Sequence, residues 1–283
     1  MTEKFDEQKY DLLANEMRYV ITDMICRAGS GHLGGAVSLI ETAITLYNRI
    51  MHVEPGNPKW EQRDRLVLSK GHAAPVLYVV LAYRGFFPKS WLKTLNADGT
   101  KLPSHADERS VPGIDMTTGS LGQGLSAACG MALAAKKAKQ KHHVFCIVGD
   151  GELNEGQNWE AAMFAPQYKL DNLIGIVDYN KLQIDGFTHE VIDLEPLSDK
   201  FTAFGWNVLE MDGHSWHDIY AKLTLAKRMD NGRPTIVIAH TTKAKNCATV
   251  ENTPGSHNIK VGDAKAHQGF LDSITTGKFE LPY

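Results

Sequence analysis

The sequence has no apolar run approaching the length of about 18 residues that a membrane-spanning helix needs. Its N-terminal stretch is charged and has no apolar core of signal-peptide length. Both absences favour a cytoplasmic protein without a membrane segment.

Cysteine is also scarce. The four present, Cys26, Cys129, Cys146 and Cys247, are far apart in the chain, and no two of them form a CxxC pair. The sequence therefore indicates neither a zinc site nor a disulfide framework, and a reducing cytosol fits best.

The chain also lacks an excess of charge of either sign. Its formal net charge is −3, so there is no electrostatic reason to expect nucleic acid or an anionic membrane as a partner. Hydrophobic residues make up 43% and charged residues 22% of the 283 residues, as in ordinary globular proteins. We expect a single domain over residues 1–283 that becomes irregular from about residue 243.

Short apolar runs recur along the chain, each bounded by charge, glycine or proline. They are too short for buried helices and are typical of buried parallel strands. They comprise residues 66–68, 144–148, 173–177, 208–211 and 235–239. Helical patterns accompany them at 7–28, 38–49, 125–139 and 158–167. This alternation predicts an α/β fold with a doubly wound, mostly parallel sheet and helices on both faces.

The most informative motif is Gly149-Asp150-Gly151, directly after the apolar run 144–148. Glycines on either side of Asp150 let backbone N–H groups approach a phosphate, and the helix that follows presents its positive end to the same anion. Asp150 itself is suited to hold a cation. A tight turn without a ligand would also explain this motif taken alone.

Asn180 follows the next apolar run, about 30 residues later. Its side-chain carbonyl, the Asp150 carboxylate and a backbone carbonyl such as that of Leu182 would supply three oxygens. With two diphosphate oxygens and water, they complete the six-oxygen shell that Mg²⁺ prefers. Ca²⁺ or Mn²⁺ would also fit such a shell.

Four further segments occur with this motif: RAGSGHLGG at 27–35, LSKGHA at 68–73, TTGSLGQG at 117–124 and NKLQIDG at 180–186. Together with GDG and Asn180 they resemble the transketolase family, in the same order along the chain. The resemblance implies a thiamine-diphosphate-binding fold. It also implies a transferase that moves a two-carbon glycolaldehyde unit from a ketose phosphate to an aldose phosphate, as in the pentose phosphate pathway.

The resemblance assigns roles residue by residue. Asp150, Asn180 and the Leu182 carbonyl take the positions of metal ligands. Positions for binding the cofactor thiamine diphosphate fall to Gly151 and to the loop Gly119, Ser120 and Leu121. The family usually has proline where Ser120 stands, a change that alters the stiffness of the loop more than its chemistry.

Histidines form the second set of candidate residues. His32, His72 and His105 lie in small polar loops and match family histidines that surround the diphosphate and the sugar, and His257 matches a fourth. His72 and His257 also match cofactor-binding positions. Imidazole suits proton transfer because its pKa lies near neutrality. Taken singly, each histidine has an equally simple explanation as a surface or hydrogen-bonded loop residue.

A complete transketolase is more than twice this length. The glutamate that activates the cofactor belongs to a separate pyrimidine-binding domain in the family, and no counterpart of that domain is present here. The resemblance therefore implies a split enzyme, with a separate subunit carrying that domain, in an α₂β₂ assembly. Glu155 and Glu160 match family positions at the dimer interface. A fragment of a longer protein would have the same sequence.

Several alternatives stay open. The residues are equally compatible with a transketolase acting on a sulfo-sugar or a branched sugar phosphate. The α chain of a 2-oxo-acid dehydrogenase also carries a GDG and Asn motif, but the segments SGHLGG, SKGHA and TTGSLGQG argue against it. A 1-deoxyxylulose-phosphate synthase fragment shares GHLGG but fits the later motifs less well. A non-catalytic regulatory or cofactor-storage subunit is the alternative from another class.

Overall fold

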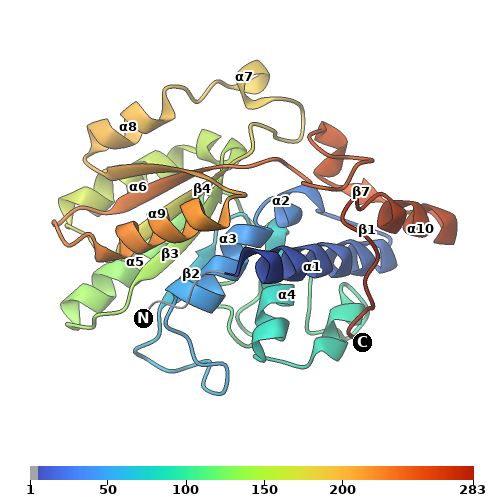
Figure 1. Cartoon of the computed structure of the whole chain (residues 1–283). Helices are drawn as coiled ribbons and strands as arrows, with labels where there is room; N and C mark the ends of the chain where they lie inside the picture. The colour runs from blue at the N-terminus through green and yellow to red at the C-terminus, as the bar shows by residue number, and fades with distance from the viewer. Residues whose placement is uncertain (1–5) are drawn as a thin grey trace.

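The structure, a computed structural model, describes residues 6–283 (Figure 1). Its main sheet has five parallel strands in the order β2-β3-β4-β6-β5. The strands are β2 Arg65–Leu68, β3 Val144–Gly149, β4 Leu173–Tyr179, β5 Asn207–Asp212 and β6 Thr235–His240. All five apolar runs of the sequence therefore form strands, and the predicted parallel sheet is confirmed.

Helices cover both faces of this sheet (Figure 1). One face carries α5 Gln123–Lys137, α6 Gly156–Gln167 and α8 Leu197–Phe204. The other carries α1 Glu7–Arg27, α2 Gly34–Val37, α3 Ile40–Thr45, α4 Ala74–Arg84 and α9 Trp216–Arg228. Side chains alternate across each strand, so Phe145 and Ile147 pack in one apolar core and Cys146 and Val148 in the other. This arrangement confirms the α/β fold with two covered faces.

The remaining elements are short. They are β1 Ser30–Gly31, η1 Leu46–Ile50, η2 Gly71–Ala73, η3 Lys89–Thr94, η4 Gly151–Asn154, α7 Thr188–Val191, η5 Pro254–Ser256, β7 Ile259–Lys260 and α10 Ala264–Asp272. Helix α2 begins at Gly34, before the helical pattern that the sequence predicts from residue 38.

The segment after residue 243 is more ordered than the sequence predicts. It contains α10, which packs against α1, and β7, which pairs antiparallel with β1 (Figure 1). The last residues of the chain then return to α1. There the hydroxyl of the final residue, Tyr283, donates to Asp23 Oδ2 over 2.6 Å. This segment therefore braces the loop that leads into α2.

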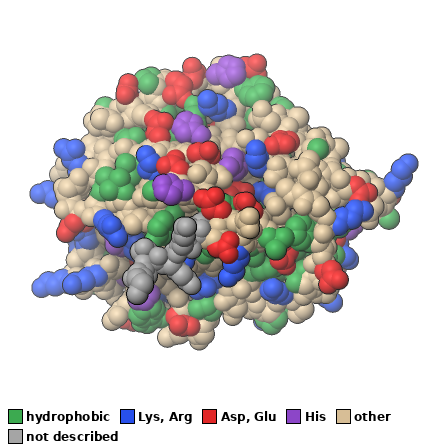
Figure 2. Space-filling model, viewed as in Figure 1, with side chains coloured by type: hydrophobic (Ala, Val, Ile, Leu, Met, Phe, Trp, Pro, Cys, Tyr) green, Lys and Arg blue, Asp and Glu red, His purple; other side chains and the backbone are tan. Residues whose placement is uncertain are grey.

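No helix within residues 6–283 is both long and apolar enough to cross a membrane. Acidic and basic side chains are interspersed on the face shown in Figure 2, as the small net charge leads one to expect.

Candidate functional site

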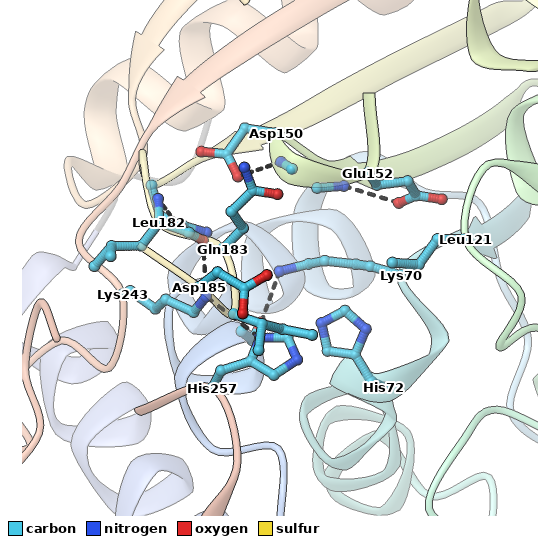
Figure 3. Close-up of a pocket in the computed structure, with 15 residues that line it drawn as sticks. Lys70, His72, Leu121, Asp150, Glu152, Leu182, Gln183, Asp185, Lys243 and His257 are labelled. Atoms are coloured by element: carbon cyan, nitrogen blue, oxygen red, sulfur yellow. Dashed lines mark hydrogen bonds between the residues drawn. The ribbon is translucent and has the colours of Figure 1, made fainter. Parts of the chain in front are cut away.

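The carboxyl ends of β3 and β4 lie side by side, with Gly149 opposite Asp178 in the sheet register. The GDG loop and the segment that begins with Asn180 therefore leave the sheet next to each other. A cavity opens at this point, and Asp150, Gly151, Asn180 and Leu182 all line it (Figure 3). Ligands of doubly wound sheets bind at such strand ends.

Asp150 is 2% exposed, and its carboxylate accepts hydrogen bonds from the backbone N–H groups of Gly151 and Lys181. Burial, together with the neighbouring charge of Asp178, raises the pKa of Asp150 to about 7. A cation beside this carboxylate would reverse that shift. At Gly151, a Cβ atom would lie 2.9 Å from the Cβ of Gln183, so a side chain at this position would displace the segment that follows β4.

The Asn180 amide nitrogen donates to Asp178 Oδ2 over 2.9 Å, which leaves its oxygen to accept from the Leu182 N–H at 3.1 Å. The Leu182 carbonyl accepts from Lys243 Nζ over 2.7 Å. Within residues 6–283 no group of three or more His, Cys, Asp or Glu side chains is arranged to hold a metal. The carboxylate of Asp150, the amide oxygen of Asn180 and the carbonyl of Leu182 are the kind of oxygens that a hard cation binds.

Two buried lysines extend into the cavity from opposite sides (Figure 3). Lys70 is 2% and Lys243 3% exposed. Burial would raise the pKa of Asp178, but its ion pair with Lys70, at 2.5 Å, lowers it overall. Burial and the charge of Lys70 lower the pKa of Lys243 to about 8. Ammonium groups facing one cavity favour an anion between them.

Sequence reasoning missed both lysines. Lys70 lies within the LSKGHA motif, so its place beside His72 was a signal available in the sequence. Lys243 follows β6 in a segment without a motif, and only the fold brings it to the Leu182 carbonyl.

The four candidate histidines come together although they lie far apart in the sequence. The ring centroid of His32 is 5.1 Å from that of His72, 5.5 Å from that of His105 and 5.3 Å from that of His257. The rings of His72 and His257 are 5.0 Å apart, and both line the cavity. The four imidazoles thus form one cluster beside the strand ends.

Burial lowers the pKa of every ring in this cluster, so the imidazoles are neutral at pH 7. For His72 the pKa falls to about 2, through burial and then the charge of Lys70. For His257 it falls to about 4, through burial and then the charge of Lys243. Burial is also the first cause for His32 and for His105. Neutral rings can accept a proton as well as a hydrogen bond.

Residues 119–121 approach the site in different ways. Leu121 lines the cavity. Gly119 packs behind His105, since a Cβ atom here would lie 3.4 Å from the His105 ring, and Ser120 is exposed. The structure therefore brings one residue of this loop to the cavity itself.

Glu155 and Glu160 do not reach the cavity. Both are exposed, and Glu155 is the residue that precedes α6. The buried carboxylate of this region is Glu152, which sequence reasoning did not single out. It joins three loops of the site through hydrogen bonds to Ser69, Gly122 and Gly149.

Known proteins resemble this chain over most of its length. Residues 9–270 match the family model described as "Transketolase, thiamine diphosphate binding domain". The chain is 51% identical over 257 residues to the 6-deoxy-6-sulfo-D-fructose transketolase subunit SqwG of Clostridium sp. (strain MSTE9), covering 90% of this chain and 93% of the relative. It is 42% identical to an apulose-4-phosphate transketolase subunit of Phocaeicola vulgatus, covering 88% of each.

Longer proteins match over less of their length. Human transketolase is 39% identical, and the match covers 94% of this chain but 42% of the human protein. The crystal structure of transketolase from Campylobacter jejuni superposes with a TM-score of 0.86 at 34% identity, covering 94% of this chain and 43% of that one. The chain thus spans less than half of these transketolases but almost all of the relatives named as subunits.

Proposed function

The chain belongs to the transketolase family, whose thiamine-diphosphate-binding domain it matches, and from this premise we propose that it is one subunit of a two-component transketolase. It transfers a two-carbon glycolaldehyde unit from a ketose to an aldose, together with a second subunit that carries the pyrimidine-binding domain. The observation that carries this proposal is the convergence of four histidine rings beside the GDG and Asn180 strand ends.

The residues of the cavity fit thiamine diphosphate and Mg²⁺. Asp150, Asn180 and the Leu182 carbonyl offer three oxygens for the cation, and Lys70 and Lys243 offer positive charge for the diphosphate. Lys243 would release the Leu182 carbonyl when that oxygen binds the metal. When bound, the cofactor supplies the electron sink for cleavage of the ketose beside its carbonyl group.

The histidines do the proton chemistry in this proposal. His32 and His105 face the sugar, bind its hydroxyl groups and hold or return a proton as the carbon–carbon bond breaks. His72 and His257 lie nearer the buried lysines and contact the diphosphate. A bound anion favours the imidazolium form, so cofactor binding raises the pKa of both rings toward neutrality.

The donor sugar is proposed from similarity alone. The 51% identity to a subunit named for 6-deoxy-6-sulfo-D-fructose favours that ketose as the first to test, before apulose 4-phosphate and the pentose phosphates. The same proposal includes the partner subunit, the α₂β₂ assembly, an interface at Glu155 and Glu160, and a single domain over residues 1–283. It also includes a cytosolic setting, which the four unpaired cysteine thiols support.

The test is reconstitution. The chain and a co-expressed subunit with the pyrimidine-binding domain are purified together, their mass is measured, and ketose cleavage is assayed with Mg²⁺ and thiamine diphosphate. We expect a heterotetramer that cleaves a ketose and does not turn over pyruvate. Pyruvate turnover without ketose cleavage would contradict the transketolase assignment in favour of a 2-oxo-acid enzyme.

The metal assignment has its own test. Replacing Asp150 with Ala should abolish Mg²⁺ and diphosphate binding together, which isothermal titration measures directly on the chain. Unchanged cofactor affinity in this variant would refute Asp150 as a ligand.

A further inference from the structure

A second cavity of about 780 Å³ lies away from the cofactor cavity and shares no lining residue with it. One wall is the segment 58–65 that enters β2, and the other is the loop 108–115. Trp91 and Lys101 close one side. We call this cavity the basic groove.

The basic groove carries an excess of positive charge. Its cationic side chains are Lys59, Arg63, Arg65, Lys101 and Arg109, and its carboxylates are Glu108 and Asp115. One of these carboxylates is already engaged, because Asp115 pairs with Arg63 and also accepts from the Leu66 N–H over 2.8 Å. Four cations, Lys59, Arg65, Lys101 and Arg109, then face a single remaining carboxylate, Glu108, so the groove keeps a net positive charge.

Arg65 makes the imbalance clear. Its guanidinium donates only to backbone carbonyls, those of Trp60, Glu61 and Arg63. Burial, followed by the charge of Arg63, lowers its pKa, although the charges of Asp115, Asp64 and Glu61 act in the opposite direction. The Lys101 ammonium lies over the Trp91 ring at 4.6 Å from its centroid. In the part of the chain that the structure describes, neither Arg65 nor Lys101 forms an ion pair with a carboxylate, and the same holds for Lys59 and Arg109.

The loop that forms one wall of the groove connects two parts of the candidate active site. It leaves His105 and returns at Gly119, and hydrogen bonds close its neck: Thr118 N to the Ala106 carbonyl at 3.0 Å, and the Thr117 hydroxyl to Asp107 at 3.0 Å. Gly119 lies against the His105 ring. A ligand that moves or stiffens this loop therefore acts on His105.

We propose that the basic groove is a regulatory site for a small phosphate-ester dianion, whose binding shifts the position of the His105 ring. Two negative charges match the uncompensated cations better than one, so a sulfonate monoanion binds less tightly. The loop between His105 and Gly119 couples the two sites. The bound anion contacts this loop in the basic groove, and the residues at its two ends belong to the active site. This inference concerns binding to the chain itself and does not depend on the proposed reaction.

The test uses the whole chain without cofactor, titrated with inorganic phosphate by calorimetry at constant ionic strength. Because Lys70 and Lys243 also attract anions, the wild-type chain should show two phosphate sites. Lys243→Gln should remove the one in the cofactor cavity. The double variant Lys101→Gln/Arg109→Gln, which changes two exposed side chains, should weaken the other by about tenfold or more. Lys137→Gln, an exposed lysine on α5, is the matched control and should change neither.

Anion binding measured by calorimetry and the NMR signals of His105 test this site. The proposal is overturned if phosphate binds the groove equally well in the Lys101→Gln/Arg109→Gln variant and in the wild type. It is also overturned if chloride competes equally well with phosphate at matched ionic strength. Methanesulfonate should bind the groove more weakly than phosphate, and equal or tighter binding would overturn the dianion. In the Lys243→Gln background, phosphate should shift the imidazole NMR signals of His105 and cease to do so once Lys101 and Arg109 are replaced. Binding without any shift would remove the regulatory role.

Discussion

Glu152 is the carboxylate that connects the loops of the cofactor cavity. Its Oε1 accepts from the Ser69 hydroxyl and from the Gly122 N–H at 2.8 Å, and its Oε2 accepts from the Gly149 N–H at 3.0 Å. The residue is 3% exposed, and burial raises the pKa of its carboxyl despite these three donors. One side chain thus fixes three segments that are distant in the sequence.

We predict that Glu152→Gln destabilises the chain by about 1–3 kcal/mol, because an amide N–H₂ then faces a backbone N–H that has lost its acceptor. Thiamine diphosphate affinity should fall as well, since the loops lose their common anchor. Urea unfolding and calorimetry measure the two effects. Glu280→Gln, an exposed carboxylate near the C-terminus, is the control and should be neutral. Equal stability of the two variants would show that Glu152 is not an anchor.

The raised pKa of Asp150 predicts a pH dependence for the metal-free chain. An acid with a higher pKa in the folded chain stabilises the fold at low pH, and this stabilisation is lost as the pH rises through the folded value. For Asp150 the window runs from its ordinary value of 3.8 to about 7. Across it, the free energy of unfolding of the wild type should fall relative to that of Asp150→Asn by on the order of 2–4 kcal/mol.

Urea unfolding of both proteins at several pH values measures this difference. A pH-independent effect of the amide on the free energy of unfolding does not change the slope of the pH profile. The histidines contribute the same pH dependence to both proteins. At pH 7, saturating Mg²⁺ and thiamine diphosphate should stabilise only the wild type. Its free energy of unfolding should then exceed that of Asp150→Asn. Parallel pH profiles in the metal-free state would show that Asp150 titrates normally.

How much of the site the sequence reveals depends on the residue. Asp150 and Asn180 are recognisable because each directly follows a strand, and the neighbouring strands bring them to one cavity. Glu152 and Lys243 are not, because their roles depend on contacts with residues far away in the chain. The loops around the histidines identify the four rings as candidates. Only the fold determines the distances between these rings.

At the scale of elements, α5 offers two glycines with opposite surroundings. A Cβ atom at Gly124 would clash with the Ser69 side chain, whereas one at Gly130 would meet nothing within 4 Å. Gly124 therefore lets α5 approach the loop that carries Lys70 and His72. Gly130 has no such function in the described chain.

We predict that Gly130→Ala stabilises the chain by about 0.5–1 kcal/mol, the difference in helix propensity. Gly124→Ala should destabilise it by about 1–3 kcal/mol, because the clash with Ser69 outweighs that gain. Thermal unfolding of both variants on the same helix gives the comparison. A stabilising Gly124→Ala would mean that the loop moves aside without cost.

The strands were predictable because each is a short apolar run, and burial on both faces of a parallel sheet requires such runs. Helix α10 was not predicted although it carries a local signal, since the Asp263 side chain caps its first turn by accepting from the Ala266 N–H at 2.8 Å. The β1–β7 pair could not be predicted. The pair joins Ser30 and Gly31 to residues more than 200 positions away, and its two-residue strands carry no periodic pattern. Long-range contacts of this kind leave no local signal.

At the scale of the whole molecule, a large apolar side chain lies exposed at the cofactor cavity. Ile184 lines the cavity and is 62% exposed. Exposed apolar residues at a binding site are typical of surfaces that a ligand or partner covers. The proposed second subunit would cover this one together with the cofactor.

We expect the exposed side chain of Ile184 to matter only in the assembled enzyme. Ile184→Asp should change the stability of the isolated chain by no more than about 0.5 kcal/mol, since an exposed side chain makes few contacts in the fold. In the reconstituted enzyme the same change should lower ketose cleavage by about tenfold or more, because covering a carboxylate without a partner group costs at least about 1.4 kcal/mol. Leu225→Asp on α9, at 45% exposure, is the matched control and should leave both measurements unchanged. If Ile184→Asp retained full activity with the partner, the surface around Ile184 would lie outside the assembly, and the second subunit would have to approach the cavity from another side.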